Sequence, residues 1–377
     1  MRMSSIAIRV GTVAVIACGL LAVAAAGGAG LAAANAQQSD APRVENARLE
    51  TRTLSGSLFT ELQNWAARSR QPQWIGYAVP QVAGNREVCC NYNGSWNQGC
   101  GTCRLEDGDR GVNMNSRDVP VKLEAPRELA ILFRAENNKI TKIRLVSTEC
   151  TVDAGDLPFV WLTGVKPAES VALLSGYVHD ENFEQHGDNR SDHEALTAIA
   201  LHADESADRA LESFVRPDER EELRKQAAFW LGEARGKAGL AALQQMAKSD
   251  PSSDVRAHVT FALSVSREPG AVDEMIRMAH DDESGHVRGQ ALFWLAQKAG
   301  QKAAGAITSA IENDPDTEVK KKAVFALSQM PKDEGVPKLI QVAQTNRNPA
   351  VRKQAMFWLG QSNDPRALEF FEKVLSR

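Results

Sequence analysis

Four cysteines lie within one fifteen-residue stretch, and their thiols are the groups in this chain whose type and spacing could do chemistry. They are Cys89, Cys90, Cys100 and Cys103. Thiols this close together can form disulfides or hold zinc, and the Cys100-Gly-Thr-Cys103 spacing also occurs in redox-active proteins. Adjacent Cys89 and Cys90 are not expected to pair with each other. The choice among these chemistries depends on the compartment in which the protein folds.

The first 36 residues have the layout of a secretory signal peptide. Arg2 and Arg9 flank the start of an apolar run over residues 10–34, and Ala34-Asn35-Ala36 offers small residues for cleavage. An uncleaved membrane anchor is an alternative, since the run is long enough to cross a bilayer. Lipidation of Cys18 is another, although the run stays apolar where a polar tether is expected. We expect cleavage and export to the periplasm or the extracellular space.

Export favours structural disulfides, because oxidising compartments preserve them. The C-x-x-C segment does not lie between an evident strand and helix, which argues against a thioredoxin-like site. Zinc binding or thiol–disulfide chemistry at Cys89–Cys103 remains the alternative function, while we predict no metal site and no cofactor. The disulfide candidates, one of which must stay unpaired, are Cys89, Cys90, Cys100, Cys103 and Cys150.

The rest of the chain carries no signature of catalysis or of nucleic-acid binding. It contains no G-x-S-x-G, no phosphate-cradling Gly-rich loop and no H-E-x-x-H. Its 44 basic and 48 acidic residues leave no basic excess of the kind that nucleic-acid binders show. We therefore expect a protein that is not an enzyme and does not bind nucleic acid.

The second half of the chain is built from a ten-residue pattern that returns every 32 residues. A fixed period of this length indicates helical hairpins that stack to bury one continuous core. A second apolar pattern of the same period follows each copy, and a less regular copy starts at Ser191. The sequence predicts an α-solenoid of about five full repeats with end caps. The copies are Leu223–Gly232, Val255–Ser264, Val287–Ala296, Val319–Ser328 and Val351–Gly360.

The half before the repeats predicts a small α+β domain. Leu58–Arg68 and Pro167–Val178 have helical spacing. Between them we expect a strand at Trp74–Val82 and three β-type runs at Leu129–Phe133, Ile140–Val146 and Phe159–Val165. Residues 37–55 are polar and without a period, which is typical of a linker. The predicted parts are a signal peptide at 1–36, a linker at 37–55, a disulfide-stapled α+β domain at 56–178, a polar joint at 179–190 and the repeat array at 191–377.

The recurring Asp…Val-Arg…Ala…Leu-Gly pattern resembles HEAT repeats, and its short period resembles the HEAT-like repeats of the phycobilisome-lyase type. This resemblance covers about half of the chain and implies a right-handed superhelix whose second helices line a concave, protein-binding face. HEAT-repeat hydroxylases bind metal through His-Glu pairs in several repeats, whereas this chain has one such pair, His193-Glu194. A bilin-lyase role would rest on the repeats alone, and a fold does not imply a function.

Two polar columns recur in the repeats, with an Asp or Asn six residues before an Arg or Lys. In HEAT-like repeats these positions resemble a hydrogen-bonded ladder that joins neighbouring units. The Asp can cap the coming helix, and the Arg can bond the carboxylate next door. We interpret the columns as structural rather than as an anion-binding row. The ladder residues are Asp218, Arg224, Asp250, Arg256, Asp282, Arg288, Asp314, Lys320, Asn346 and Arg352.

A column of phenylalanines is the predicted partner-binding site. On a helical wheel the apolar positions of each copy cluster within about 55° of one direction, and the Phe points about 145° away. A row of exposed rings indicates an interaction site, and flanking amides could hold the backbone of an extended peptide. The alternative is that each ring is buried against the neighbouring repeat. The predicted site residues are Phe229, Phe261, Phe293, Phe325 and Phe357, beside Gln226, His258, Gln290, Lys322 and Gln354.

The column after the phenylalanines alternates in size and predicts packing rather than binding. Large residues facing small ones allow layers of side chains to interdigitate. The alternation doubles the period to 64 residues, which indicates duplication of a two-repeat unit. Its members are Trp230, Ala262, Trp294, Ala326 and Trp358.

These patterns together predict an exported, non-enzymatic protein-binding scaffold. The partner would be another protein or an extended peptide in the cell envelope, bound at the concave face of the solenoid through the Phe and amide columns. After signal cleavage no other segment is apolar enough to span a membrane.

Overall fold

A computed structural model of the protein describes residues 41–84, 88, 102–106, 112–113, 127–179, 191–298 and 300–376. The predicted signal peptide lies outside the described residues, as do Cys89, Cys90, Cys100 and residues 180–190 of the predicted joint. None of the described helices is both long enough and apolar enough to cross a membrane.

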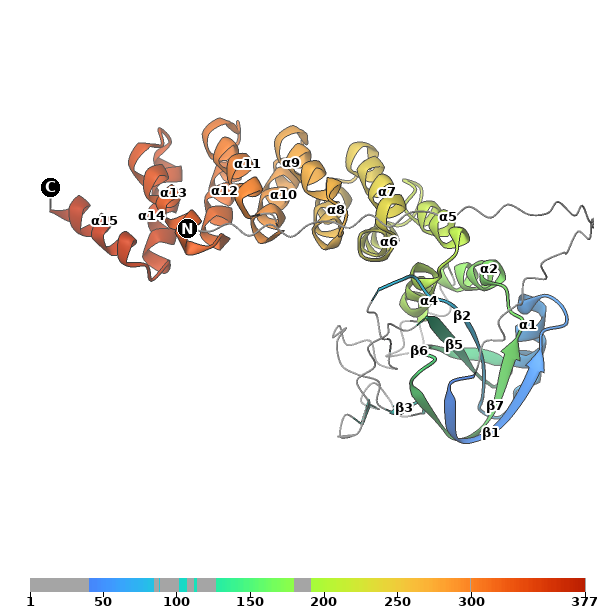
Figure 1. Cartoon of the computed structure of the whole chain (residues 1–377). Coiled ribbons are helices and arrows are strands. Elements are labelled where there is room, and N and C mark those ends of the chain that lie inside the picture. The colour runs from blue at the N-terminus through green and yellow to red at the C-terminus, as the bar shows by residue number, and fades with distance from the viewer. Residues whose placement is uncertain are drawn as a thin grey trace, which may run out of the picture. The chain divides into compact units, whose positions relative to one another are not determined.

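The described part of the N-terminal half forms a seven-stranded mixed sheet in the order β4-β3-β7-β2-β5-β6, with β1 paired to β7 (Figure 1). Strand β7 runs parallel to β1, β2 and β3, whereas β2, β5 and β6 are antiparallel neighbours. The strands are β1 (Arg43–Thr53), β2 (Gln73–Pro80), β3 (Thr102–Arg104), β4 (Val112–Asn113), β5 (Glu128–Glu136), β6 (Lys139–Ser147) and β7 (Thr151–Thr163).

Strand β1 corrects the prediction of a linker over residues 37–55. It pairs with β7 along its length, from Arg43 opposite Thr151 to Thr53 opposite Thr163. The side chains of β1 are mostly exposed or half buried, so the strand carries no buried apolar face. The linker interpretation relied on the lack of apolar alternation. It therefore could not detect a solvated strand that is held by backbone hydrogen bonds.

Both faces of the sheet are buried, since apolar side chains of β2 point alternately to each. Ile75, Tyr77 and Val79 join a cluster with helices α1 (Leu58–Arg68) and α2 (Pro167–Val178). Trp74 and Ala78 lie in a second cluster on the other face, which also contains the two described cysteines, Cys103 and Cys150.

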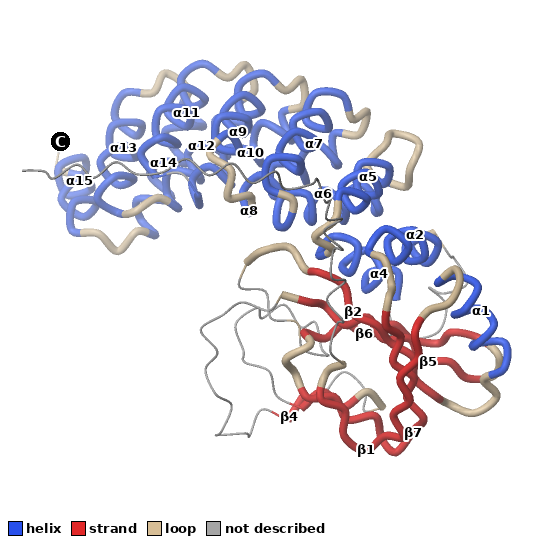
Figure 2. Tube along the Cα trace, turned by 45° about the vertical axis from the view of Figure 1, so that its right-hand side comes forward, coloured by secondary structure: helices blue, strands red, loops and turns tan. Residues whose placement is uncertain are grey.

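The repeats form two rows of helices, as predicted for an α-solenoid (Figures 1 and 2). The first helices of successive repeats pack closely on one another, and each second helix packs beside its own first helix. The first row consists of α4 (Ser191–Leu201), α6 (Glu221–Ala234), α8 (Ser253–Val265), α10 (Gly285–Lys298), α12 (Thr317–Gln329) and α14 (Pro349–Gln361). The second row consists of α5 (Glu205–Phe214), α7 (Gly236–Ser249), α9 (Gly270–Asp281), α11 (Gly300–Asn313), α13 (Lys332–Thr345) and α15 (Pro365–Leu375).

The core of the repeats is continuous with the core on one face of the sheet. At the junction Glu194 of α4 accepts a hydrogen bond from buried Arg144 of β6, with 2.8 Å between Nη1 and Oε1. His202, just after α4, lies 2.9 Å from the Ser170 hydroxyl of α2. The sheet and the first repeat therefore share both apolar and polar contacts.

Candidate partner-binding face of the repeats

The structure brings all five predicted phenylalanines into one line of touching rings with the three tryptophans of the next column. Phe229 stacks on Phe261 with centroids 5.9 Å apart, and Phe293 stacks on Phe325 at 6.0 Å. Each stack ends against the tryptophan of the following helix, at 4.8 Å for Phe261 and 4.9 Å for Phe325. The aromatic row, in the order of its contacts, is Trp230, Phe229, Phe261, Trp294, Phe293, Phe325, Trp358 and Phe357.

The alternation of Trp and Ala explains the contacts within the row. A helix that carries Ala leaves space beside its Phe, and the Trp of the next helix fills that space. Pairs of rings contribute about 0.5–1.5 kcal/mol each beyond the area that they bury. The column that we predicted to serve packing therefore does contact its neighbours across the repeats, in ring contacts shared with the phenylalanines.

The expectation of five uncovered rings is corrected by this geometry. Phe229, Phe261, Phe293 and Phe325 are half buried, because a ring of the next helix covers each one. Only the ring of Phe357, on the last first-row helix, is more than half exposed, at 53%. A helical wheel gives the direction of each side chain around its own helix. It cannot show whether side chains of a neighbouring helix cover that side chain.

The amide column lies beside the aromatic row but does not form a uniform edge. Gln226 bonds back to His193 of α4, with 2.9 Å between the two Nε2 atoms. His258 lies edge-on to Phe261 at 5.6 Å, and burial lowers its pKa. Lys322 covers Gly289 with its aliphatic stem, since a Cβ at that glycine would come within 2.3 Å of Lys322 Cδ. The half-buried members Gln290 and Gln354 complete the column.

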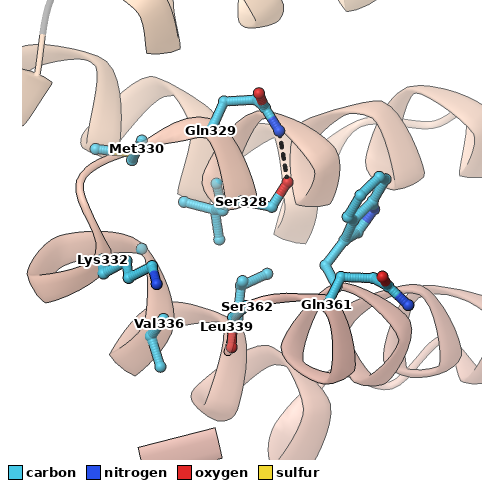
Figure 3. A pocket seen from close by; sticks show the side chains of 11 residues that line it. Ser328, Gln329, Met330, Lys332, Val336, Leu339, Gln361 and Ser362 are labelled. Atoms are coloured by element: carbon cyan, nitrogen blue, oxygen red, sulfur yellow. Dashed lines mark hydrogen bonds between the residues drawn. The ribbon is translucent and has the colours of Figure 1, made fainter. Parts of the chain in front are cut away.

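A cavity of about 150 Å³ opens near the C-terminal end of the aromatic row, between α12, α13 and α14 (Figure 3). Ser328 and Gln329 line it from the end of α12, and Gln361 lines it from α14. Trp358 lines it as well, and its indole Nε1 is buried without a hydrogen-bond partner among the described residues. This cavity was not predicted, because it depends on where three helix ends meet.

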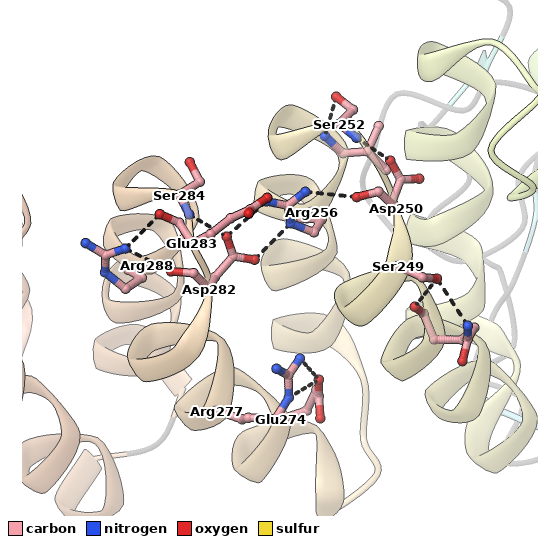
Figure 4. Close-up of polar contacts among 12 residues, drawn as sticks. Ser249, Asp250, Ser252, Arg256, Glu274, Arg277, Asp282, Glu283, Ser284 and Arg288 are labelled. Atoms are coloured by element: carbon pink, nitrogen blue, oxygen red, sulfur yellow. Dashed lines mark hydrogen bonds and ion pairs between the residues drawn. The ribbon is translucent and has the colours of Figure 1, made fainter.

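The Arg and Asp columns form bidentate pairs between successive repeats (Figure 4). Arg256 donates to Asp282 through Nε at 2.9 Å and Nη2 at 3.1 Å. Both side chains are less than a tenth exposed, and the paired carboxylate raises the pKa of Arg256 further. Arg256 Nη1 also donates to the Asp250 carbonyl at 2.9 Å, which ties the pair to its own loop. The equivalent pairs are Arg224 with Asp250 and Arg288 with Asp314.

The prediction that the Asp column caps the helices is wrong, because the capping residue lies two positions after each Asp. Asp250 Oδ1 accepts from the backbone N–H of Ser252 at 2.9 Å, and Ser252 is the residue that caps α8. Asp314 acts in the same way on Asp316, which caps α12. The Asp column therefore orders the loop, and the residue two positions later caps the helix.

The pairs stop at both ends of the series. Asp218 is exposed and approaches Arg216 at 3.4 Å instead of joining the ladder. Lys320 donates to the Glu312 carbonyl at 2.7 Å rather than across the interface. Asn346 accepts from the Asn348 N–H at 2.9 Å, and Arg352 Nη1 donates to the Asn346 carbonyl at 2.8 Å.

The described cysteines lie away from the repeats. Cys103 is 1% exposed and Cys150 is fully buried, both within the second cluster of the sheet. In the described part of the chain no group of three or more His, Cys, Asp or Glu side chains is arranged to hold a metal ion.

Several solved structures are similar to part of the chain. Among solved structures, the chain is similar to the complex of CpcE and CpcF of phycocyanin lyase from Nostoc sp. PCC7120, at 20% identity over 41% of this chain and 99% of that chain, with a TM-score of 0.33. It is similar to human deoxyhypusine hydroxylase in complex with glycerol at 18% identity over 54% and 77% of the two chains, with a TM-score of 0.24. It is also similar to Kap121p at 14% identity over 55% of this chain and 27% of that one, with a TM-score of 0.36.

No curated protein matches the chain. The family described as HEAT repeats matches residues 208–296 and 304–377, which agrees with the two rows of helices and with the period of the sequence. This part of the chain is an array of HEAT repeats.

Proposed function

We propose that the HEAT-repeat array is a non-enzymatic scaffold that binds an extended segment of another protein at the C-terminal end of its aromatic row. The observation that carries this proposal is where apolar side chains are exposed. Five of the seven large apolar side chains that are exposed in the described residues belong to α14 and α15. They are Met356, Phe357, Leu368, Val374 and Leu375.

The chemistry of this end suits a peptide. Phe357 offers an open ring at 53% exposure, and a concentration of exposed apolar side chains is typical of an interaction site. The adjacent cavity adds the amide of Gln361 and the hydroxyl of Ser328. An extended segment could place an apolar side chain on Phe357 and a backbone carbonyl at the Gln361 amide.

A pair of matched phenylalanine variants tests the proposal. We expect Phe357→Ser to abolish capture of a crosslinked partner from cell-envelope extracts while the thermal unfolding midpoint stays within about 2 °C of that of the parent protein. The control is Phe59→Ser on α1, because Phe59 is similarly exposed, at 58%, but belongs to the sheet domain. Equal capture by both variants would exclude this end of the array as the binding site.

Export and the disulfide staple belong to the same proposal. The support for export is the N-terminal sequence, and sequencing the N-terminus of the mature protein tests it: we expect Gln37 as the first residue. The support for the staple is that Cys103 and Cys150 are both buried in the second cluster of the sheet. Titration of the denatured, unreduced protein should then find no more than one free thiol.

The burial of Cys103 also bears on the alternative of thiol–disulfide chemistry. Exchange requires a thiolate that can attack and be attacked, and a sulfur that is 1% exposed is inaccessible to a second protein. The structure therefore offers no support for a redox function at this position.

A further inference from the structure

The fourth interface of the ladder differs from the three before it in the chemistry that it presents. At the first three interfaces an Arg donates two hydrogen bonds to the Asp of the next repeat, at 2.8–3.2 Å. At the fourth interface Lys320 replaces the Arg and Asn346 replaces the Asp. The ion pair of the first three interfaces is thus replaced by a cation next to a neutral amide.

The remaining bonds of Asn346 show which of its atoms faces the cation. Its Oδ1 accepts from the Asn348 N–H at 2.9 Å, as Asp314 Oδ1 accepts from the Asp316 N–H at 2.8 Å. The atom of Asn346 in place of Asp Oδ2 is therefore Nδ2, a donor. In the paired interfaces this second position is the oxygen that accepts from the Arg Nε. The Lys320 ammonium and this Nδ2 are both donors, so the bond from Arg Nε to Asp Oδ2 at the paired interfaces has no counterpart at the fourth.

A cavity of about 480 Å³ opens at this interface, between α11, α13 and the loop that leads into α14. Three basic side chains line it, from Lys320, Lys338 and Arg347, against one acidic side chain, from Glu312. No ion pair joins any of the three basic groups to a carboxylate among the described residues. The Thr308 hydroxyl, which also lines the cavity, is buried and has no partner among the described residues.

We infer that this cavity binds an anionic group, a carboxylate or a phosphate, which supplies beside Asn346 the negative charge that the Asp carboxylate supplies at the other three interfaces. The ammonium of Lys320 and the amide Nδ2 of Asn346 donate to its oxygens, and Lys338 and Arg347 balance the rest of its charge. The cavity is larger than one such group, so the ligand carries further atoms. The site is independent of the aromatic row, and its failure would leave the proposed scaffold function untouched.

The variant that tests this inference is Asn346→Asp, because it restores the carboxylate from within the chain. The full exported protein is titrated calorimetrically with inorganic phosphate and, separately, with a hexapeptide of glutamates, at constant ionic strength. We expect saturable binding of at least one probe, weakened at least tenfold by Asn346→Asp. The variant should unfold no earlier than the parent, so that loss of binding cannot be assigned to misfolding.

Asn64→Asp is the matched control, since it makes the same charge change on an exposed residue of α1 and should leave binding unchanged. Binding of phosphate alone would assign a free or phosphorylated ligand, and binding of the peptide alone would assign an acidic protein segment. The inference is overturned if neither probe saturates, or if Asn346→Asp binds as tightly as the parent.

Discussion

At the scale of single residues, the interfaces between repeats contain buried Arg and Asp side chains that pair through two hydrogen bonds. Arg224 and Asp250 are 5% and 1% exposed, and each of the two oxygens of Asp250 accepts a bond from Arg224. Taking two charges out of water is costly, so such a pair adds little net stability over an apolar pair. Removing one partner is a different matter, because the other charge then stays buried and unpaired.

Asp250→Asn is therefore expected to destabilise the protein strongly. The new amide keeps the acceptor for the Ser252 N–H but loses the charge that pairs with Arg224. We expect the free energy of unfolding of the repeats to fall by about 3 kcal/mol, measured by denaturant titration. Asp218→Asn is the control, because Asp218 is 71% exposed and should change stability by less than about 0.5 kcal/mol. Equal effects would contradict the ladder.

Residue-scale prediction from the sequence succeeded where spacing alone decides. A period of 32 residues placed Arg256 and Asp282 in the right columns, because neighbouring repeats superimpose every equivalent position. The period could not predict contacts that depend on residues of a loop or of a neighbouring helix. The capping role went to Asp250 instead of Ser252, and the ring of Phe293 was expected in solvent although Phe325 covers it.

At the scale of elements, the first helices can approach closely because small residues stand between them. Gly232 of α6 lies so near α8 that a Cβ on it would come within 2.1 Å of the Ala262 carbonyl oxygen. That atom belongs to the backbone and cannot swing away. The equivalent position in the last repeat is Gly360, around which a Cβ would meet nothing within 4 Å.

The same substitution at these two glycines should change the free energy of unfolding in different directions. Gly232→Ala should lower the free energy of unfolding by about 1–3 kcal/mol, since α6 and α8 must move apart. Gly360→Ala should leave stability unchanged or raise it by up to about 1 kcal/mol, since alanine is the better helix former and no neighbour is displaced. Thermal unfolding of both variants measures the difference, and a similar loss in both would show that backbone contact is not the cause.

The aromatic row gives a second contrast between elements. Phe293→Ala removes a ring that stacks on Phe325 and touches Trp294, so we expect a loss of about 3 kcal/mol. Phe357→Ala removes a ring with one aromatic neighbour and 53% exposure, and should cost less than about 1 kcal/mol. Chemical denaturation of the two variants decides, and a loss at Phe357 as large as at Phe293 would mean that the last repeat is packed more tightly than the structure shows.

The bounds of two helices in the sheet domain followed from the sequence, whereas β7 begins eight residues before the predicted run Phe159–Val165. The helices Leu58–Arg68 and Pro167–Val178 have the bounds that their apolar spacing predicted. Strand β1 was missed, because its residues contribute backbone hydrogen bonds and almost no buried side chains. The cavities were also beyond prediction, since each depends on the meeting of separate helix ends.

At the scale of residues 38–377, which form one compact unit, the sheet and the array are connected through α2 and α4. His202 Nδ1 lies 2.6 Å from the Ala198 carbonyl, which can only accept, so this nitrogen carries the proton. Nε2 is then an acceptor for the Ser170 hydroxyl at 2.9 Å, and Ser170 in turn accepts from the Tyr77 hydroxyl at 2.8 Å. A directed chain of hydrogen bonds thus joins the sheet to the first repeat.

This junction predicts how stability depends on pH. Burial is the largest influence on His202 and lowers its pKa from 6.5 to about 4; Asp204 acts in the opposite sense, and Arg235 in the same sense as burial. The unfolded chain therefore binds one more proton than the folded protein between these pH values. The contribution of His202 to stability should be constant above pH 6.5 and should fall as the pH drops from 6.5 towards 4, by about 3 kcal/mol in total.

The measurement is the free energy of unfolding against pH for the parent protein and for two variants. His202→Gln keeps a neutral side chain at the junction and should lose this slope between pH 6.5 and 4, although it should be less stable at pH 7. His280→Gln, at a residue that is 78% exposed, should keep the slope of the parent. If His202→Gln kept the slope, protonation of other groups would cause the loss of stability in acid. The hydrogen-bonded chain from Tyr77 to Ala198 would then not be the pH-sensitive contact between the sheet and the repeats.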